Sequence, residues 1–280
     1  MSQTIAITGA STGIGLATAQ LFAAKGWTVF AGTRNLEREQ AAYSEVADLH
    51  WLEMEVTDPA SLERAFAAIA EKTGGKLDVL FCNAGYGYLR ALGQAPMNEI
   101  EDVFDTNVYG VINTIKAGLP LLREAGKGHL LATSSVGGLV GQPFNEIYCA
   151  SKFAVEGLFE SLATYYKPLF NIDVTLIEPG AIATNFVQAV YKNINATGGM
   201  LDDEYKPLID AYVSNFTKRA SVPQTAESVA EVVLDVVQRE EKPLRIRTSE
   251  AAEAFSAHKT VNDPTGNAGV LGVRKLHLGL

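Results

Sequence analysis

The chain has 280 residues and a mass of 30.0 kDa, with 47% hydrophobic and 20% charged residues. This composition is that of a globular protein with enough apolar mass for a large core, and it excludes a disordered chain. The net charge is −9 and the 23 basic residues are scattered, so no basic stripe exists to bind a phosphate backbone and we expect no nucleic-acid partner.

Short apolar runs alternate with longer helical patterns along the chain. The runs are TIAIT (4–8), TVFAG (28–32), LHWLEME (49–55), LDVLFCN (77–83), HLLATSS (129–135) and IDVTLIE (172–178). Helices are expected between them, for example at 14–25, which Gly26 ends, and at 59–72, where Asp58 can cap the helix and Pro59 suits its first turn. A helix at 225–239 and a seventh strand, LRIRT (244–248), follow. The alternation predicts βαβ units and a parallel sheet in one domain over 1–280.

The alternation breaks once, between about 184 and 224, where five aromatic residues and a Gly-Gly pair accompany helical fragments without a strand. Two interpretations stay open: a substrate lid, or a helical decoration that packs its own aromatic side chains. The C-terminal tail, from about 255 to 280, is too irregular for an assignment.

Other simple features bound the location and the chemistry. No stretch of about eighteen apolar residues could span a membrane, and the N-terminus lacks the pattern of a signal peptide, so we expect no membrane span and a cytoplasmic location. Cys82 and Cys149 are expected to be free buried thiols, in keeping with a reducing compartment. The four histidines, at 50, 129, 258 and 277, have no ligand spacing, so we predict no metal site.

The first strand runs directly into TGASTGIG and then into a helix. Glycines let the backbone turn sharply and approach a pyrophosphate, and the helix that follows presents unpaired N–H groups. The order of strand, glycine loop and helix predicts a dinucleotide cradle, although the spacing G-x-x-x-G-x-G differs from the commoner G-x-G-x-x-G and an unliganded tight turn is the alternative. The predicted binding residues are Gly9, Ser11, Thr12, Gly13, Ile14 and Gly15.

The end of the second strand, AGTRN, bears on the choice of cofactor. An NAD site usually has a carboxylate about twenty residues after the glycine loop to bind the ribose hydroxyls. Thr33 stands at that place and Arg34 follows, so a 2′-phosphate gains a cation together with the hydroxyl of Ser11. The sequence therefore predicts that the cofactor is NADP(H). The alternatives are that the cofactor is NAD(H) and that Arg34 is a solvent-exposed residue that binds no ligand.

The segment NEIYCASKFAVEGL (145–158) places Tyr148 and Lys152 one turn apart on a helical pattern. Hydride transfer between a nicotinamide and a carbonyl needs a proton donor and a group that polarises the oxygen. Tyr148 is the candidate donor, and Lys152, together with the charge of the oxidised nicotinamide, is expected to lower its pKa from about 10. Lys152 is also expected to reach the ribose hydroxyls. Ser135, at the end of the fifth strand, is expected to hold the substrate oxygen.

TGASTGIG, NAG (83–85), Asn107, Ser134-Ser135, YCASK and Pro179-Gly180 together resemble the short-chain dehydrogenase/reductase family over roughly residues 3–185. The resemblance implies an α/β, doubly wound Rossmann fold, with a mostly parallel seven-stranded sheet and helices on both faces. It implies that Tyr148 is the general acid/base, that Ser135 orients the carbonyl, and that Asn107 holds a proton-relay water through its backbone near Lys152. The further cofactor contacts it implies are Asn83, Ala84, Gly85, Pro179, Gly180 and Thr184.

One position departs from the family pattern. Where the family usually has an aspartate near the adenine, this chain has Glu55 in EVTD, so the contact is expected to shift, while Val56 can still bond through its backbone. The segment 134–163 is similar to the branch that contains 17β-hydroxysteroid and retinol dehydrogenases, which implies a small apolar ketone, aldehyde or alcohol as substrate. Related enzymes are often homodimers or homotetramers that pack through the helices corresponding to 96–125 and 148–167, and we expect the same here.

Three other functional classes agree less well with these residues. A non-catalytic NADP(H) sensor of the same fold would have no reason to keep Asn107, Ser135, Tyr148 and Lys152 together. A serine hydrolase would need G-x-S-x-G, and TSSVG lacks the first glycine. A sugar-nucleotide epimerase or dehydratase would usually have a different glycine spacing and a longer C-terminal region.

Overall fold

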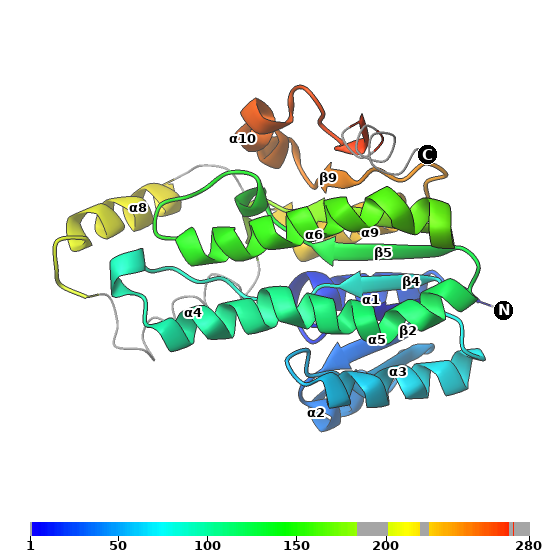
Figure 1. Cartoon of the computed structure of the whole chain (residues 1–280). Helices are drawn as coiled ribbons and strands as arrows, with labels where there is room; N and C mark the ends of the chain where they lie inside the picture. Colours follow the sequence, from blue (N-terminus) through cyan, green and yellow to red (C-terminus); the bar gives the residue numbers. More distant parts are fainter. Residues whose placement is uncertain (1, 184–200, 219–223, 269–270, 272–280) are drawn as a thin grey trace.

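The computed structural model describes residues 2–183, 201–218, 224–268 and 271. Seven strands form one sheet in the order β3-β2-β1-β4-β5-β6-β9 (Figure 1). Their bounds are β1 Thr4–Ile7, β2 Thr28–Thr33, β3 Leu49–Glu53, β4 Val79–Cys82, β5 Gly128–Thr133, β6 Ile172–Glu178 and β9 Arg245–Arg247. Every neighbouring pair in this sheet is parallel, so the predicted fold class and the seventh strand are confirmed. Two short strands, β7 Ile182–Ala183 and β8 Gln224–Thr225, pair separately.

Helices connect the strands and cover both faces of the sheet (Figure 1). Their bounds are α1 Gly13–Ala24, α2 Leu36–Ala42, α3 Pro59–Thr73, α4 Met97–Phe104, α5 Gly110–Glu124, α6 Glu146–Phe170, α8 Lys206–Lys218, α9 Ala226–Gln238 and α10 Glu250–Thr260. A π-helical turn, Asp105–Tyr109, joins α4 to α5 so that the two run on as one rod (Figure 1). The sequence did not predict α2 or α10, and the C-terminal tail expected from about 255 begins inside α10.

Local signals explain where the predicted helices begin and end. The side chain of Asp58 accepts a hydrogen bond from the backbone N–H of Ala60 at 3.0 Å, and Pro59 occupies the first turn of α3. Gly74 ends that helix in the left-handed conformation, with φ of 67°, which glycine adopts without a steric penalty. The sequence-predicted bounds of α3 therefore hold to within one residue.

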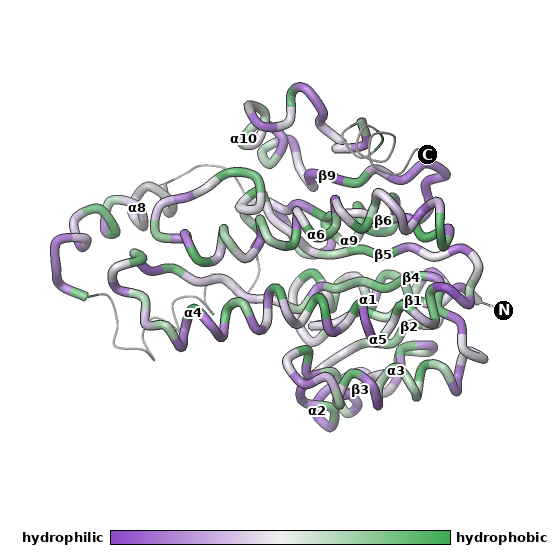
Figure 2. The backbone as a smooth tube through the Cα atoms, in the orientation of Figure 1, coloured by the Kyte–Doolittle hydropathy of each residue, from purple (hydrophilic) through white to green (hydrophobic). Residues whose placement is uncertain are grey.

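The core has two layers, one on each face of the sheet, because strand side chains alternate between the faces. Ile5 and Ile7 of β1 pack with the cluster that contains Phe22 of α1 and Val233 of α9. Ala6, between them, belongs to the cluster on the opposite face, which α3, α5 and α6 cover. Apolar residues accordingly follow the central strands and the inner sides of these helices (Figure 2).

The strand order places the ligand-binding edge of the sheet. From β1 the chain adds β2 and β3 on one side and then returns to add β4, β5 and β6 on the other. In open parallel sheets, ligands bind outside the carboxyl ends of the strands where the order reverses. This point lies between β1 and β4, next to the glycine loop that follows β1.

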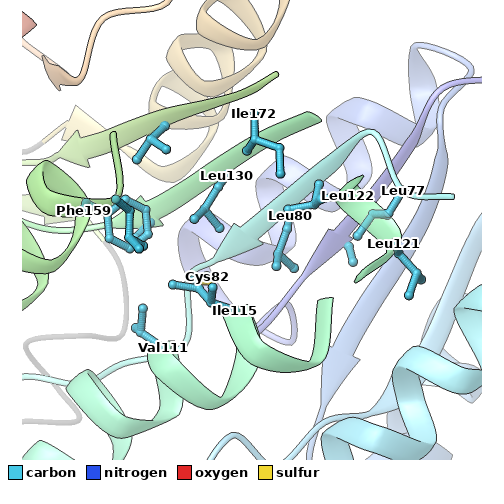
Figure 3. Packing of buried hydrophobic residues seen from close by; sticks show 14 of the residues in the cluster. Leu77, Leu80, Cys82, Val111, Ile115, Leu121, Leu122, Leu130, Phe159 and Ile172 are labelled. Carbon is cyan, nitrogen blue, oxygen red and sulfur yellow. The ribbon is translucent and has the colours of Figure 1, made fainter. Parts of the chain in front are cut away.

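Phe159 should contribute strongly to stability because it joins α6 to the sheet. Its side chain is fully buried and lies near Leu130 and Val111 (Figure 3). We expect Phe159→Ala to lower the free energy of unfolding by about 3 to 5 kcal/mol, the usual cost of emptying a buried phenylalanine site. Urea unfolding would measure this, with Phe153→Ala as the control, because Phe153 lies on the same helix and is 41% exposed. Equal losses in the two variants would contradict the assignment of Phe159 to the core.

Within the described part of the chain, no helix combines the length and the apolar character needed to cross a membrane.

Candidate active site

The glycine loop closes tightly on the end of β4. Gly9 and Gly13 have φ of 64° and 57°, in the left-handed region that favours glycine. A Cβ atom on Gly9 would lie 2.8 Å from Cα of Ala84, and one on Gly15 would collide with the carbonyl oxygen of Gly9 and with Nδ2 of Asn83. No side chain fits at positions 9 and 15, so the loop keeps its backbone accessible for a close approach.

The first turn of α1 is free of side-chain caps. Thr12 is the N-cap residue, its side chain makes no capping hydrogen bond, and the first turn contains no acidic residue. The N–H groups at a helix N-terminus and the positive end of the helix dipole bind anions when no cap occupies them. Ser11 and Ile14 flank this turn and are half-buried. The loop and the helix start therefore fit the pyrophosphate of a dinucleotide.

Asn83 holds the ends of three neighbouring strands together. Its Nδ2 donates hydrogen bonds to the carbonyl oxygens of Gly9 at 3.1 Å and Thr8 at 3.2 Å, and its Oδ1 accepts one from the hydroxyl of Thr133 at 2.9 Å. The Thr8 hydroxyl in turn accepts from the backbone N–H groups of Asn83 and Ala84. Asn83 and Ala84 thus shape the glycine loop from the side of β4. The sequence did not single out Thr8 or Thr133.

The residues predicted for the adenosine end lie on the loops after β2 and β3. Arg34 is exposed, and the hydroxyl of Thr33 accepts a hydrogen bond from the N–H of Asn35 at 3.1 Å. The carboxylate of Glu55 is turned into its own loop, where it accepts from the N–H and the hydroxyl of Thr57. Val56 is buried, and its carbonyl oxygen accepts a hydrogen bond from Asn113 Nδ2 at 3.1 Å. The carboxylate of Glu55 and the carbonyl oxygen of Val56 are thus already engaged within the chain.

Ser135 and Tyr148 meet at the carboxyl end of β5. The Ser135 hydroxyl accepts a hydrogen bond from the N–H of Gly137 at 3.0 Å and lies 3.5 Å from the carbonyl oxygen of Pro179. Burial raises the pKa of Tyr148 to about 12, and a hydrogen bond with the Ser135 side chain opposes this rise. Tyr148 is therefore protonated at neutral pH in the environment that the chain itself provides.

The sequence predicts that Lys152, together with the oxidised nicotinamide, lowers the pKa of Tyr148. The groups of the chain alone raise this pKa, and Lys152 does not oppose the rise. The two residues do share a helix face, but Nζ of Lys152 donates a hydrogen bond to the carbonyl oxygen of Thr133 at 2.8 Å and lies 5.8 Å from the centre of the Tyr148 ring. Lys152 is only 5% exposed, and burial lowers its pKa to about 8, partly opposed by Glu156. Helix spacing fixes which residues are neighbours, whereas the backbone carbonyl decides where the ammonium group points.

Asn107 is fully buried in the π-helical turn between α4 and α5. Its amide group exchanges two hydrogen bonds with the backbone of Tyr86, at 2.9 and 3.0 Å, and Nδ2 also donates to the hydroxyl of Ser151 at 3.1 Å. A Cβ on Gly85 would lie 3.0 Å from Asn107 Oδ1 and 3.5 Å from Lys152 Nζ. Asn107 and Lys152 therefore meet across Gly85, and single-turn π-bulges of this kind occur often at functional sites.

The predicted cofactor residues after β6 are only partly described. Pro179 is buried, and its carbonyl oxygen accepts a hydrogen bond from the N–H of Val136 at 3.0 Å. Gly180 is half-buried next to Ala252 of α10. Thr184 lies outside the described residues.

The predicted lid, 184–224, is described over 201–218 and at 224. There, Ile209 of α8 packs with Leu89, Ala91 and Phe144, and Tyr205 and Tyr212 lie against this cluster. Asn145 Nδ2, at the start of α6, donates a hydrogen bond to the hydroxyl of Tyr212 at 3.0 Å. The described part of the insertion thus packs against the loops next to the N-terminus of α6, the helix that carries Tyr148. The remainder, 184–200 and 219–223, lies outside the described residues.

Within the described part of the chain, no group of three or more His, Cys, Asp and Glu side chains could hold a metal ion. Cys82 and Cys149 are both buried free thiols. Burial raises the pKa of both thiols, so neither is prone to react at neutral pH.

The sheet order, the side-chain-free glycine loop and the uncapped start of α1 together define a dinucleotide-binding protein of the Rossmann class. A profile described as short chain dehydrogenase matches residues 3–195. The chain belongs to the short-chain dehydrogenase family, and the resemblance inferred from its motifs is confirmed.

Two curated relatives cover almost the whole chain. 17-beta-hydroxysteroid dehydrogenase type 1 of Mus musculus is 36% identical over 94% of this chain and 78% of that protein. Retinol dehydrogenase 8 of Bos taurus is 34% identical over 95% of this chain and 87% of that protein. The chain is therefore an oxidoreductase of the hydroxysteroid and retinol dehydrogenase type, a family that acts on CH–OH and C=O groups.

Solved structures agree with the fold and with a nicotinamide cofactor. A short-chain dehydrogenase from Streptomyces avermitilis has a TM-score of 0.77 at 27% identity, over 100% of this chain and 98% of that chain. A serine dehydrogenase in complex with NADP+ has a TM-score of 0.75 at 25% identity, over 88% and 94%. A Burkholderia phymatum dehydrogenase in complex with NAD has a TM-score of 0.78 at 24% identity, over 93% and 94%. Both NADP and NAD thus occur among proteins of this fold.

Proposed function

We propose that the protein is an NADP(H)-dependent oxidoreductase that interconverts an apolar ketone or aldehyde and the corresponding alcohol. The observation that carries the proposal is the meeting of Ser135, Tyr148, Lys152 and Asn107 at the carboxyl end of the sheet, next to the glycine loop. When bound, the nicotinamide supplies or accepts the hydride. The residues of the chain supply the proton and the orientation.

In the direction of reduction, the carbonyl carbon gains a hydride and the carbonyl oxygen gains a proton from the hydroxyl of Tyr148. Ser135, which hydrogen-bonds Tyr148, orients the same oxygen. The raised pKa of Tyr148 supports this role, because the group holds its proton at neutral pH until the oxygen becomes more basic. After each turnover a proton from solvent returns to Tyr148 by way of the Lys152 ammonium group, and Asn107, which meets Lys152 across Gly85, positions this relay.

The preference for NADP(H) is supported by Thr33 and Arg34. Arg34 is exposed and can bind a 2′-phosphate, and Thr33 leaves no carboxylate to bind the 2′-hydroxyl. We expect Arg34→Ala to raise the KM for NADPH at least about 10-fold, the effect of losing one charge-assisted hydrogen bond. The KM for NADH should stay unchanged.

Arg38→Ala is the matched control for this experiment. Arg38 is also exposed and close in sequence, but it pairs with Glu39. If Arg34→Ala alters the KM of NADPH and NADH equally, Arg34 does not read the 2′-phosphate.

An apolar substrate is supported by the cluster of Leu89, Ala91, Phe144 and Ile209 near the start of α6. The names of the two relatives, a hydroxysteroid and a retinol dehydrogenase, support the same substrate class, and we propose that the described residues 201–218 of the insertion form a lid over it. We also propose a homodimer or homotetramer, supported by exposed Tyr109 and Phe153 near and on the helices α5 and α6. The two free thiols support a cytoplasmic location.

A substrate panel tests the proposed function. Purified protein with NADPH is mixed with steroid ketones, retinal, aryl ketones or small diketones, and the loss of NADPH absorbance is followed. We expect one apolar class to be reduced well above the others. NADPH binding without turnover of any carbonyl would contradict the proposal and favour a nucleotide-sensing role.

A further inference from the structure

A cluster of charged side chains is buried behind the active site. Glu156, one turn beyond Lys152 on α6, and Glu178, the last residue of β6, are 5% and 0% exposed. Nε of Arg245, on β9, lies 2.8 Å from Glu156 Oε2, and Nη1 of Arg247 lies 3.2 Å from Glu178 Oε2. Buried carboxyl groups are costly unless they are paired and hydrogen-bonded, so two of them together indicate a specific role.

Each of these two carboxyl groups keeps one buried oxygen that lacks a well-formed hydrogen bond. Glu156 Oε1 and Glu178 Oε1 are buried and make no hydrogen bond of normal geometry, although the Ser134 hydroxyl lies beside Glu156 and Nε of Arg245 lies 3.5 Å from Glu178 Oε1. A proton on one carboxyl group lets it donate a hydrogen bond to the other, because a protonated carboxyl group is a donor. Burial and the neighbouring Glu156 raise the pKa of Glu178 to about 9, and burial also raises the pKa of Glu156, so the pair holds one proton at neutral pH.

The pair lies directly behind the proposed catalytic residues. A Cβ on Gly138 would lie 2.7 Å from Ser134 Oγ, 3.0 Å from Glu156 Cγ and 3.2 Å from the carbonyl oxygen of Lys152, so these three groups meet at one point. Ser134 directly precedes Ser135, and Glu178 directly precedes Pro179. The charged groups that face the pair are Lys152 and Glu160 on α6, Arg245 and Arg247 on β9, and Glu253 on α10 through Arg247.

We propose that Glu156 and Glu178 share one proton and act as a positioning pair that holds Lys152 in its charged form and ties β9 to the active site. This inference rests on the proposed function. Glu156 is the negative group four residues from Lys152 on the same helix, and it favours the ammonium form of a lysine that burial would otherwise discharge. Arg245 and Arg247 fix the two carboxyl groups from the C-terminal strand.

Thermal unfolding of the full chain tests the shared proton. The pKa of Glu178 in the fold lies above its value in the unfolded chain, so its contribution to stability is complete below the unfolded pKa and is lost as pH rises towards about 9. Glu178→Gln, which is always neutral, should remove this loss. The Tm difference between Glu178→Gln and the wild type should therefore change with pH. We expect it to shift in favour of the variant by about 2 to 4 °C or more between pH 6 and pH 9.

Glu160→Gln is the matched control, because Glu160 also pairs with Arg245 but is 45% exposed. Its Tm should follow that of the wild type across the pH range. Parallel curves for Glu178→Gln and the wild type would overturn the shared proton.

The positioning role is tested through NADPH binding and through the pH profile of turnover. In Glu156→Gln, Lys152 loses the neighbour that keeps it charged. The NADPH affinity of this variant, followed by fluorescence, should be several-fold lower at pH 8.5 than at pH 6.5. The pH at which its kcat falls on the alkaline side should be lower than in the wild type, by on the order of one pH unit. Glu160→Gln should match the wild type in both.

A folded Glu156→Gln variant with wild-type affinity and pH profile would overturn the positioning role while leaving the proposed function intact. If the wild type reduces no carbonyl, the proposed function fails, and the NADPH titration still decides the role of Glu156.

Discussion

Replacing Tyr148 by phenylalanine should lower kcat for carbonyl reduction by about 10² to 10⁴-fold, the range typical of a lost general acid. The substitution removes one hydroxyl group and leaves the ring in its half-buried place beside Ile147, Tyr88 and Val103. The hydroxyl is the group that hydrogen-bonds Ser135 and that, in the proposed mechanism, holds the transferable proton. Steady-state kinetics with NADPH and the best carbonyl of the panel would measure the loss.

Two controls make the result specific to proton transfer. Tyr165→Phe, on the same helix at a position 38% exposed, should keep wild-type kcat. The NADPH affinity of Tyr148→Phe should stay within a few-fold of the wild type, because in the proposed site the glycine loop binds the pyrophosphate. A Tyr148→Phe variant that retains most of its kcat would remove Tyr148 from the mechanism.

Gly15→Ala should weaken dinucleotide binding by at least an order of magnitude. The new Cβ would collide with the carbonyl oxygen of Gly9 and with Nδ2 of Asn83, two groups that neighbouring strands hold in place. Because backbone cannot yield as a flexible side chain does, the loop must move out of the conformation that fits a pyrophosphate. We expect NADPH affinity to fall more than about 10-fold, which corresponds to about 1.4 kcal/mol, and Tm to fall by several degrees.

Gly157→Ala is the control for this substitution. Gly157 is also helical, and a Cβ there meets nothing within 4 Å. An alanine in the open middle of a helix should leave NADPH affinity unchanged and raise stability by about 0.5 to 1 kcal/mol. If Gly15→Ala binds NADPH as tightly as Gly157→Ala does, the cradle has been assigned to the wrong residues.

The sheet could be predicted from the sequence because its strands are apolar runs separated by helical patterns of sufficient length. The seventh strand, Arg245–Arg247, is an exception to this rule, because two of its three residues are arginines and its prediction depended on its place after the helix at 225–239. Helix α2 could not be found in the same way, because Leu36–Ala42 is short and mostly polar. For α10 a signal was present: Ser249 caps the helix through the N–H of Ala252, and Glu250 and Glu253 lie in its first turn.

The glycine loop and the spacing of Tyr148 and Lys152 also follow from the sequence, because both depend on short-range geometry. The direction of the Lys152 side chain does not, since its partner is the backbone carbonyl of Thr133 on another element. The buried pair of Glu156 and Glu178 was missed for the same reason. These two residues are 22 positions apart and are brought together only when α6 packs on β6 and Arg245 of β9 pairs with both.

Isotope transfer tests the central claim most directly. NADPH carrying deuterium at C4 of the nicotinamide, on one face and then on the other, is mixed with the wild-type protein and the best carbonyl of the panel. The alcohol product is then examined by mass spectrometry. We predict deuterium at the carbinol carbon from one face only, because the site holds cofactor and substrate in one orientation. Alcohol without deuterium from either face, or no alcohol at all, would contradict hydride transfer at this site.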